Sequence, residues 1–134
     1  MGMTIEVTSG TMATLLEEAA KAAPMECCGL LLGAAGMVVE ARPAANVAPD
    51  PARHFEIDPA ALFAAHRAAR LGGLELLGYY HSHPDGHPVP SATDCEHASG
   101  DHRVWAIVAS GEVAFWRDGP GGFAGLEITI VEEE

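Results

Sequence analysis

Two largely apolar runs of strand length limit most strongly what this chain can fold into. The first, Cys27–Gly33, follows Pro24 and ends in a Gly-rich turn, and the second, Leu74–Tyr80, leads directly into His81. Such runs, bounded by turn residues, are typical of central strands that are buried on both faces. We therefore expect a sheet with helices packed on it.

The segments around these runs predict an interleaved order of helices and strands. Helices are expected at Gly10–Ala23, from an Asp58 N-cap through Arg70, and from Ser91 toward Ala98. Further strands are expected at Met37–Arg42, Phe55–Ile57, Val104–Ala109, Glu112–Arg117 and Phe123–Val131. Tight turns join several of these strands, which favours a mixed sheet over a purely parallel one.

Length and composition narrow the class of protein. The chain has 134 residues, and residues 1–134 are expected to form a single domain. A net charge of −12 argues against a nucleic-acid partner, because such affinity rests on cation–phosphate contacts. The longest nearly apolar stretch, Gly29–Val39, is too short to span a membrane. Three cysteines, two of them adjacent, and an N-terminus without a basic leader favour a reducing cytoplasm.

The chemistry-bearing residues gather in one short stretch. His81 and His83 are separated by one residue, so on a strand both imidazoles project from the same face, with Cα atoms about 7 Å apart. Asp94 follows after a proline-rich loop that can fold back toward the pair. Two neutral imidazoles and a carboxylate are ligands that zinc prefers, and three protein ligands leave the fourth position open for catalysis.

Each of these signals also has an ordinary structural interpretation. A His-x-His pair arises by chance in many sequences, and Ser91-x-x-Asp94 is a capping box. The cap is compatible with metal binding, because a fixed helix start orients Asp94 toward the histidines. Glu26 stands where a buried strand begins, so it is either an exposed strand-end residue or a paired, protonated or catalytic one.

In combination these residues resemble the signature of the JAMM (MPN+) metalloprotease family. That signature is a Glu, then His-Ser/Thr-His, seven residues, Ser, two residues and Asp. Every position is filled here, by Glu26, His81-Ser82-His83, Ser91 and Asp94. The order of expected elements is also similar to that of a minimal prokaryotic JAMM domain.

The resemblance implies a fold and a set of roles. The fold would be a cytidine-deaminase-like three-layer α/β sandwich with a mixed sheet and flanking helices. His81, His83 and Asp94 would bind one Zn²⁺ per chain. Glu26 would act as general base and then acid, and Ser91 would donate a hydrogen bond to the oxyanion.

The resemblance also implies a substrate class. JAMM enzymes cut amide or isopeptide bonds after the tail of ubiquitin or a ubiquitin-like protein. Members that cut ubiquitin chains generally carry insertions that clamp the two ubiquitins, and the Asn46–Arg53 loop is too short for one. In this respect the chain is similar to prokaryotic members, some of which act on sulfur-carrier proteins ending in Gly-Gly. The alternatives are a deubiquitinase-like isopeptidase and a non-catalytic MPN-type binding module.

Other residues in the neighbourhood are weaker candidates. His87 lies in the loop before Ser91 and is expected in solvent, although it could approach the metal. Cys28 and Cys95 could act as ligand or nucleophile, but both are expected to be small buried residues.

Overall fold

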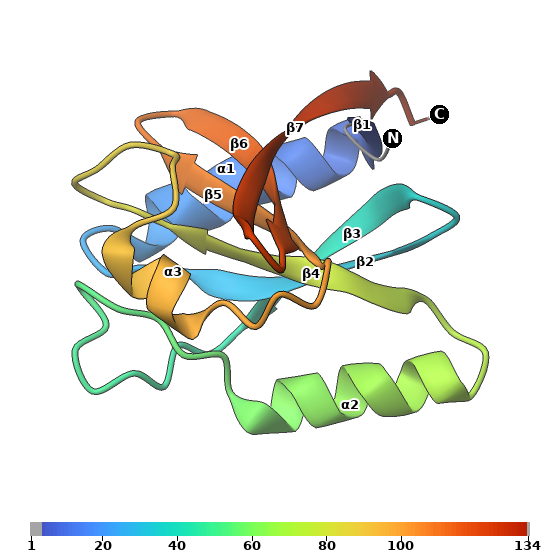
Figure 1. Cartoon of the computed structure of the whole chain (residues 1–134), viewed down its shortest axis with the longest axis horizontal. Helices are drawn as coiled ribbons and strands as arrows, with labels where there is room; N and C mark the ends of the chain where they lie inside the picture. Colours follow the sequence, from blue (N-terminus) through green and yellow to red (C-terminus); the bar gives the residue numbers. More distant parts are fainter. Residues whose placement is uncertain (1–3, 134) are drawn as a thin grey trace.

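A computed structural model describes residues 4–133 of the chain. Met1–Met3, which belong to the stretch assessed for a leader, and Glu134 of the expected domain lie outside the described residues. The helices are α1 (Ser9–Ala22), α2 (Pro59–Arg70) and α3 (Ala92–His97) (Figure 1). The strands are β1 (Thr4–Thr8), β2 (Cys28–Ala34), β3 (Met37–Ala44), β4 (Glu75–Ser82), β5 (Val104–Ala109), β6 (Glu112–Gly119) and β7 (Gly122–Val131).

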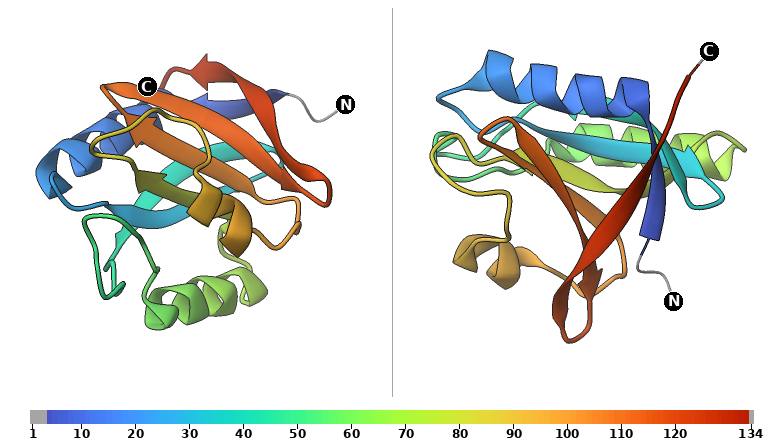
Figure 2. Two further views of the ribbon diagram at one scale, coloured as in Figure 1. Left: turned by 60° about the vertical axis from the view of Figure 1, so that its left-hand side comes forward. Right: turned by 90° about the horizontal axis from the view of Figure 1, so that it is seen from above.

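The strands form one strongly curved mixed sheet. Their order is β1-β3-β2-β4-β5-β6-β7, and β1 also pairs with β7, which closes the sheet. The pairs β1/β3, β1/β7 and β4/β5 are parallel, and the remaining pairs are antiparallel. Figure 2 shows β7 returning across the molecule to lie beside β1. The predicted mixed sheet with flanking helices is confirmed.

Both predicted central strands lie where their apolar character requires. Along β2, Leu31 belongs to the core cluster beneath α1, whereas Leu30 and Leu32 belong to the cluster beneath α2. All three side chains are at most 2% exposed. The strand is therefore buried on both faces, as the apolar run predicts, and the two long helices cover opposite faces of the sheet (Figure 1).

Helix ends follow the expected capping chemistry. The Asp58 carboxylate accepts a hydrogen bond from the Ala60 N–H at 3.0 Å and precedes Pro59 at the first helical position. At α1 the Thr8 hydroxyl accepts from the Thr11 N–H at 3.3 Å. No described helix is long and apolar enough to cross a membrane.

Two local assignments from the sequence need correction. Strand β1 is not anticipated, because its five residues stand directly before the stronger helical pattern of α1; in the structure Ile5 and Val7 point into the core. The strand expected at Phe55–Ile57 is wrong, since only an isolated bridge between Ile57 and Asn46 forms there. Residues 46–57 instead make a loop closed at its base by that bridge, which we call the Asn46 loop.

Candidate active site

The two histidines stand at the C-terminal end of β4. His81 is the last residue but one of this strand, and His83 follows it directly. Their side chains share a face, as the spacing predicts, and the two Nε2 atoms are 3.0 Å apart. His81 is fully buried and His83 is half-buried. One face of a strand end thus brings together two imidazole nitrogens.

Asp94 reaches the same point from α3, which lies beside this end of β4 (Figure 1). Its Oδ2 atom is 3.1 Å from the Nε2 of His81 and 3.2 Å from the Nε2 of His83. The predicted capping box is present: the Ser91 Oγ accepts from the Asp94 N–H at 3.0 Å, and the Ser91 N–H donates to Oδ2 at 2.9 Å. The cap therefore fixes Asp94 toward the histidines, as expected.

Hydrogen bonding selects the tautomer of His83. Its Nδ1 donates to the backbone carbonyl of His87 at 2.8 Å, so the neutral ring carries its lone pair on Nε2. Burial lowers the pKa of His81, so this imidazole is neutral near pH 7. Phe55 of the Asn46 loop stacks on the His81 ring, with centroids 4.1 Å apart, and holds its orientation.

The charge state of Asp94 completes the donor set. Burial alone would raise the pKa of this carboxyl, but hydrogen bonds with His81 and His83 and from the Ser91 N–H outweigh burial and lower it. Asp94 is therefore ionised at neutral pH. Two imidazole nitrogens and one carboxylate oxygen, all within 4.8 Å of one another, converge on one point. This set fits a zinc ion with one coordination position left for water or substrate.

Glu26 lies next to this cluster, directly before β2. In the antiparallel register of β2 and β4, Cys28 faces His81, and extending that register by two residues places Glu26 opposite His83. The Glu26 residue is only 8% exposed. Burial raises its pKa to about 7, with His83 acting in the opposite sense. Of the two readings left open by the sequence, the exposed strand-end residue is therefore wrong.

Ser91 combines an engaged acceptor with a free donor. Its Oγ accepts from the Asp94 N–H, and the hydroxyl proton has no partner among the described residues. The Ser91 residue itself is exposed. The hydroxyl can therefore donate a hydrogen bond toward a group that enters beside Asp94.

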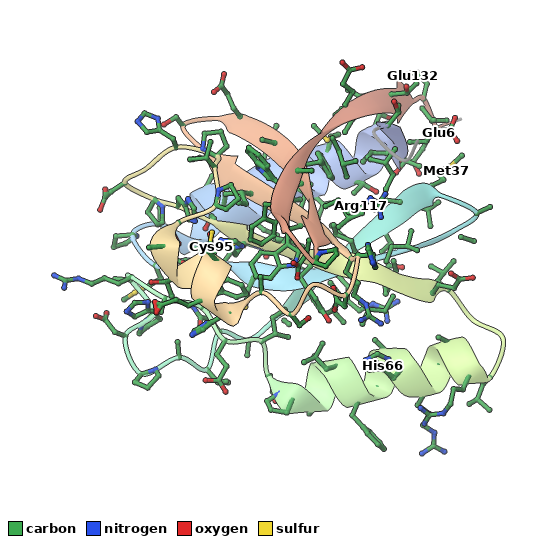
Figure 3. The ribbon with its side chains drawn as sticks, in the orientation of Figure 1. Glu6, Met37, His66, Cys95, Arg117 and Glu132 are labelled. Carbon is green, nitrogen blue, oxygen red and sulfur yellow. The ribbon has the colours of Figure 1, made fainter. Side chains whose placement is uncertain are left out.

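The weaker candidates have other surroundings. The His87 side chain is exposed, as expected, and this residue contributes only its carbonyl to the cluster. Cys28 is 2% exposed, with its thiol toward the Ala44 and Ala45 carbonyls. The expectation for Cys95 is wrong: it lies on α3 directly after the buried Asp94 and is exposed (Figure 3).

Two contributors to the site are not found by sequence reasoning. Phe55 and Asn46 both come from a loop that carries no motif. Their roles depend on which residues they touch in the folded chain: Phe55 stacks on His81, and Asn46 hydrogen-bonds the backbone carbonyl of Glu26 at 3.0 Å. The apolar Phe-x-Ile pattern signalled burial there, but not the partner.

Comparison with known proteins gives concordant matches. The profile of prokaryotic homologs of the JAB domain matches residues 8–119. A desampylase from Haloferax volcanii is 43% identical over 93 residues, which cover 68% of this chain and 67% of that protein. A probable TtuB-protein conjugate cleaving protease from Thermus thermophilus is 33% identical over 133 residues, which cover 97% of this chain and 84% of that protein.

A solved structure has a similar fold. Protein DSY2949 from Desulfitobacterium hafniense has a TM-score of 0.84 at 31% identity, and the match covers 96% of this chain and 94% of that one. The chain therefore belongs to the family of prokaryotic JAB-domain proteins. The predicted family and the predicted enzyme class, a hydrolase, are both confirmed.

Proposed function

We propose that this protein is a zinc-dependent peptidase or isopeptidase. Its substrate would be the amide bond that follows the Gly-Gly-type tail of a ubiquitin-like or sulfur-carrier protein. The observation that carries this proposal is the convergence of His81 Nε2, His83 Nε2 and Asp94 Oδ2 within 3.0–3.2 Å of one another. Buried Glu26 lies beside that point.

His81, His83 and Asp94 would hold one zinc ion per chain. When bound there, zinc supplies Lewis-acid chemistry: it polarises a carbonyl group and acidifies water. Contacts within the chain fix the orientation of all three ligands. The His87 carbonyl accepts from His83, and Phe55 stacks on His81. The capping box holds Asp94. Such pre-orientation avoids reorganisation when substrate enters.

Glu26 would move the proton. Burial raises the pKa of this carboxyl to about 7 in the metal-free chain, and a nearby cation would favour its ionised form. As a carboxylate it can accept a proton from the attacking water and then pass it to the leaving amine. Its partial burial keeps bulk water from competing for that proton. The Ser91 hydroxyl would donate a hydrogen bond to the carbonyl oxygen as negative charge develops there.

We assign the substrate tail to a cavity near the cluster. A cavity of about 540 Å³ lies between the Asn46 loop and α3, with Pro49 and Phe55 on one side and Thr93 and Glu96 on the other. Phe55 touches His81 and Thr93 precedes Asp94, so the cavity adjoins the proposed metal site. An extended tail laid in it would approach the cluster from the side of Phe55 and Thr93.

The named relatives support the substrate class. The Haloferax volcanii protein is called a desampylase, and the Thermus thermophilus protein is described as cleaving TtuB-protein conjugates. We extend this class, conjugates of small ubiquitin-like proteins, to the present chain. A cytoplasmic location is part of the same proposal, and the free thiols of Cys27, Cys28 and Cys95 are consistent with it.

Metal content and cleavage, measured on the same samples, test the proposal. The probe is a ubiquitin-like domain ending in Gly-Gly, joined to one further residue by a peptide bond or to a lysine by an isopeptide bond. We expect about one zinc per chain in wild type and in Glu26→Gln, and none in His83→Ala. Cleavage is expected in wild type alone.

Each other outcome identifies a different error. Full cleavage by Glu26→Gln would show that another group is the base. Zinc binding without cleavage of either probe would favour the non-catalytic binding module. Cleavage restricted to ubiquitin chains would favour the deubiquitinase-like alternative.

A further inference from the structure

The side-chain amide of Asn46 is the centre of the loop that borders the site. Its Nδ2 donates to the backbone carbonyls of Glu26 and His54, and its Oδ1 accepts from the backbone N–H groups of Ala48 and Glu56, each at 3.0 Å. An amide has two N–H donors and a carbonyl with two lone pairs. All four capacities of Asn46 are therefore used, three of them inside the loop and one outside it.

The bond that leaves the loop reaches the proposed base. The Asn46 amide holds the carbonyl of Glu26, while the carbonyl of Pro51, in the same loop, accepts from the Glu26 N–H at 2.8 Å. Both backbone polar groups of Glu26 are thus bound by the Asn46 loop. Glu26 precedes β2, so no sheet partner performs this task.

The same loop also contacts the His81–His83–Asp94 cluster. Phe55 stacks on His81, and its position follows from the bonds that Asn46 makes to its two neighbours, through the carbonyl of His54 and the N–H of Glu56. One side chain therefore sets the distance between the backbone that carries the base and the ring that packs on a ligand.

We propose that Asn46 is a positioning residue, which holds the Glu26 carboxylate in register with the His81–His83–Asp94 cluster for proton transfer. This inference rests on the proposed function, because it assigns Asn46 a role through the proposed base. Misplacement of a catalytic group by about 1 Å can lower the rate about 100-fold. We expect the effect in kcat, since all hydrogen-bonding groups of the Asn46 amide are engaged by backbone atoms of the chain.

Asn46→Asp removes the bond to Glu26 and one bond inside the loop, to His54, and keeps the other two loop bonds. The aspartate has the same size and still accepts from the Ala48 and Glu56 N–H groups, but it has no donor for the Glu26 and His54 carbonyls. We expect kcat to fall about 10- to 100-fold, with KM changed less than about twofold and about one zinc per chain retained. Val47→Ala, a neighbouring exposed position in the same loop, is the matched control and should leave kcat and KM unchanged.

Two results would overturn the inference. If Asn46 only closes the loop, Asn46→Asp will retain wild-type kcat. If the loop serves substrate binding alone, KM will rise and kcat will stay the same. Should Asn46→Asp not fold, Asn46→Gln, which keeps the donors on a longer arm, is expected to lower kcat, and an unchanged kcat there counts equally against the inference.

A double variant distinguishes this inference from the proposed function. In a Glu26→Gln background, Asn46→Asp should leave the residual single-turnover rate unchanged, because the two residues act as one unit. A further fall in that background would show that Asn46 acts elsewhere. An inactive wild type, or an active Glu26→Gln, contradicts the proposed function itself, whereas normal kcat in Asn46→Asp contradicts only the role of Asn46.

Discussion

Two buried aspartates in this molecule have opposite surroundings. Asp94 is 3% exposed and Asp118, in β6, is 1% exposed. Asp118 accepts from the backbone N–H groups of Ser99 and Gly100, at 3.0 and 3.1 Å. Asp94 receives one backbone N–H, and otherwise its Oδ2 faces the Nε2 atoms of two imidazoles, at 3.1 and 3.2 Å.

The comparison shows that burial of a charge does not by itself identify a functional site. Each carboxylate oxygen of Asp118 accepts from one backbone N–H, so the carboxylate stabilises the loop between α3 and β5. Asp94 Oδ2 instead lies against two imidazole nitrogens, each of which can donate a hydrogen bond to it or, once deprotonated, bind a cation together with it. The nature of the partners, and not the depth of burial, separates the two roles.

The largest expected effect comes from removing the charge of Asp94. Asp94→Asn should lose bound zinc, and kcat/KM should fall about 1,000-fold or more, equivalent to about 4 kcal/mol of transition-state stabilisation. Zinc analysis and cleavage of the Gly-Gly-tailed probe measure both quantities. Retention of zinc and activity would mean that Asp94, like Asp118, is only structural.

The matched substitution Asp118→Asn should have the converse effect. It places an amide N–H against one of two backbone N–H groups, so the free energy of unfolding should fall by about 2–3 kcal/mol. Zinc content and the kcat/KM of the folded fraction should match wild type. Denaturant unfolding gives the first value. A variant that lost zinc at full stability would join Asp118 to the site and invalidate the contrast.

The smallest effect concerns pH and the third buried carboxyl, Glu26. The pKa of Glu26 is about 7 in the folded chain, above the value of 4.5 for an ordinary glutamate. Between pH 4.5 and about pH 7 the folded state therefore binds more protons at this residue than the unfolded state does. The free energy of unfolding of zinc-depleted protein should therefore decrease as pH rises from about 5 to 8, by about 2 kcal/mol relative to Glu26→Gln. Asp94, whose pKa is lowered, acts in the opposite sense and loses its contribution only at acid pH.

If the free energies of unfolding of wild type and Glu26→Gln change in parallel from about pH 5 to pH 8, Glu26 is solvated in the folded state. Its assignment as a buried base would then be wrong.

Local chemistry explains which features the sequence could predict. His81-x-His83 on a strand and Ser91-x-x-Asp94 at a helix start fix side-chain directions over a few residues, so their convergence needed only that the intervening loop fold back. The apolar run of β2 likewise contained its own burial signal. Hence the mixed sheet, the helices and the cluster could be predicted.

Tertiary contacts decided what could not be predicted. Asn46 acts on Glu26, 20 residues away in sequence, and Asp118 acts on Ser99, 19 residues away. Neither has a local pattern that names its partner. The short strand β1 is stabilised by β3 and β7, which come from distant parts of the chain, so its five residues gave too weak a signal alone.

Locating the metal in the folded protein tests zinc binding by His81, His83 and Asp94 most directly. A crystal structure of the zinc-loaded protein, with anomalous data collected at the zinc edge, should show a single ion. We expect it to be bound by Nε2 of His81, Nε2 of His83 and the carboxylate of Asp94, with its remaining position facing Glu26. An ion bound elsewhere, or a fourth protein ligand closing that position, would contradict the account.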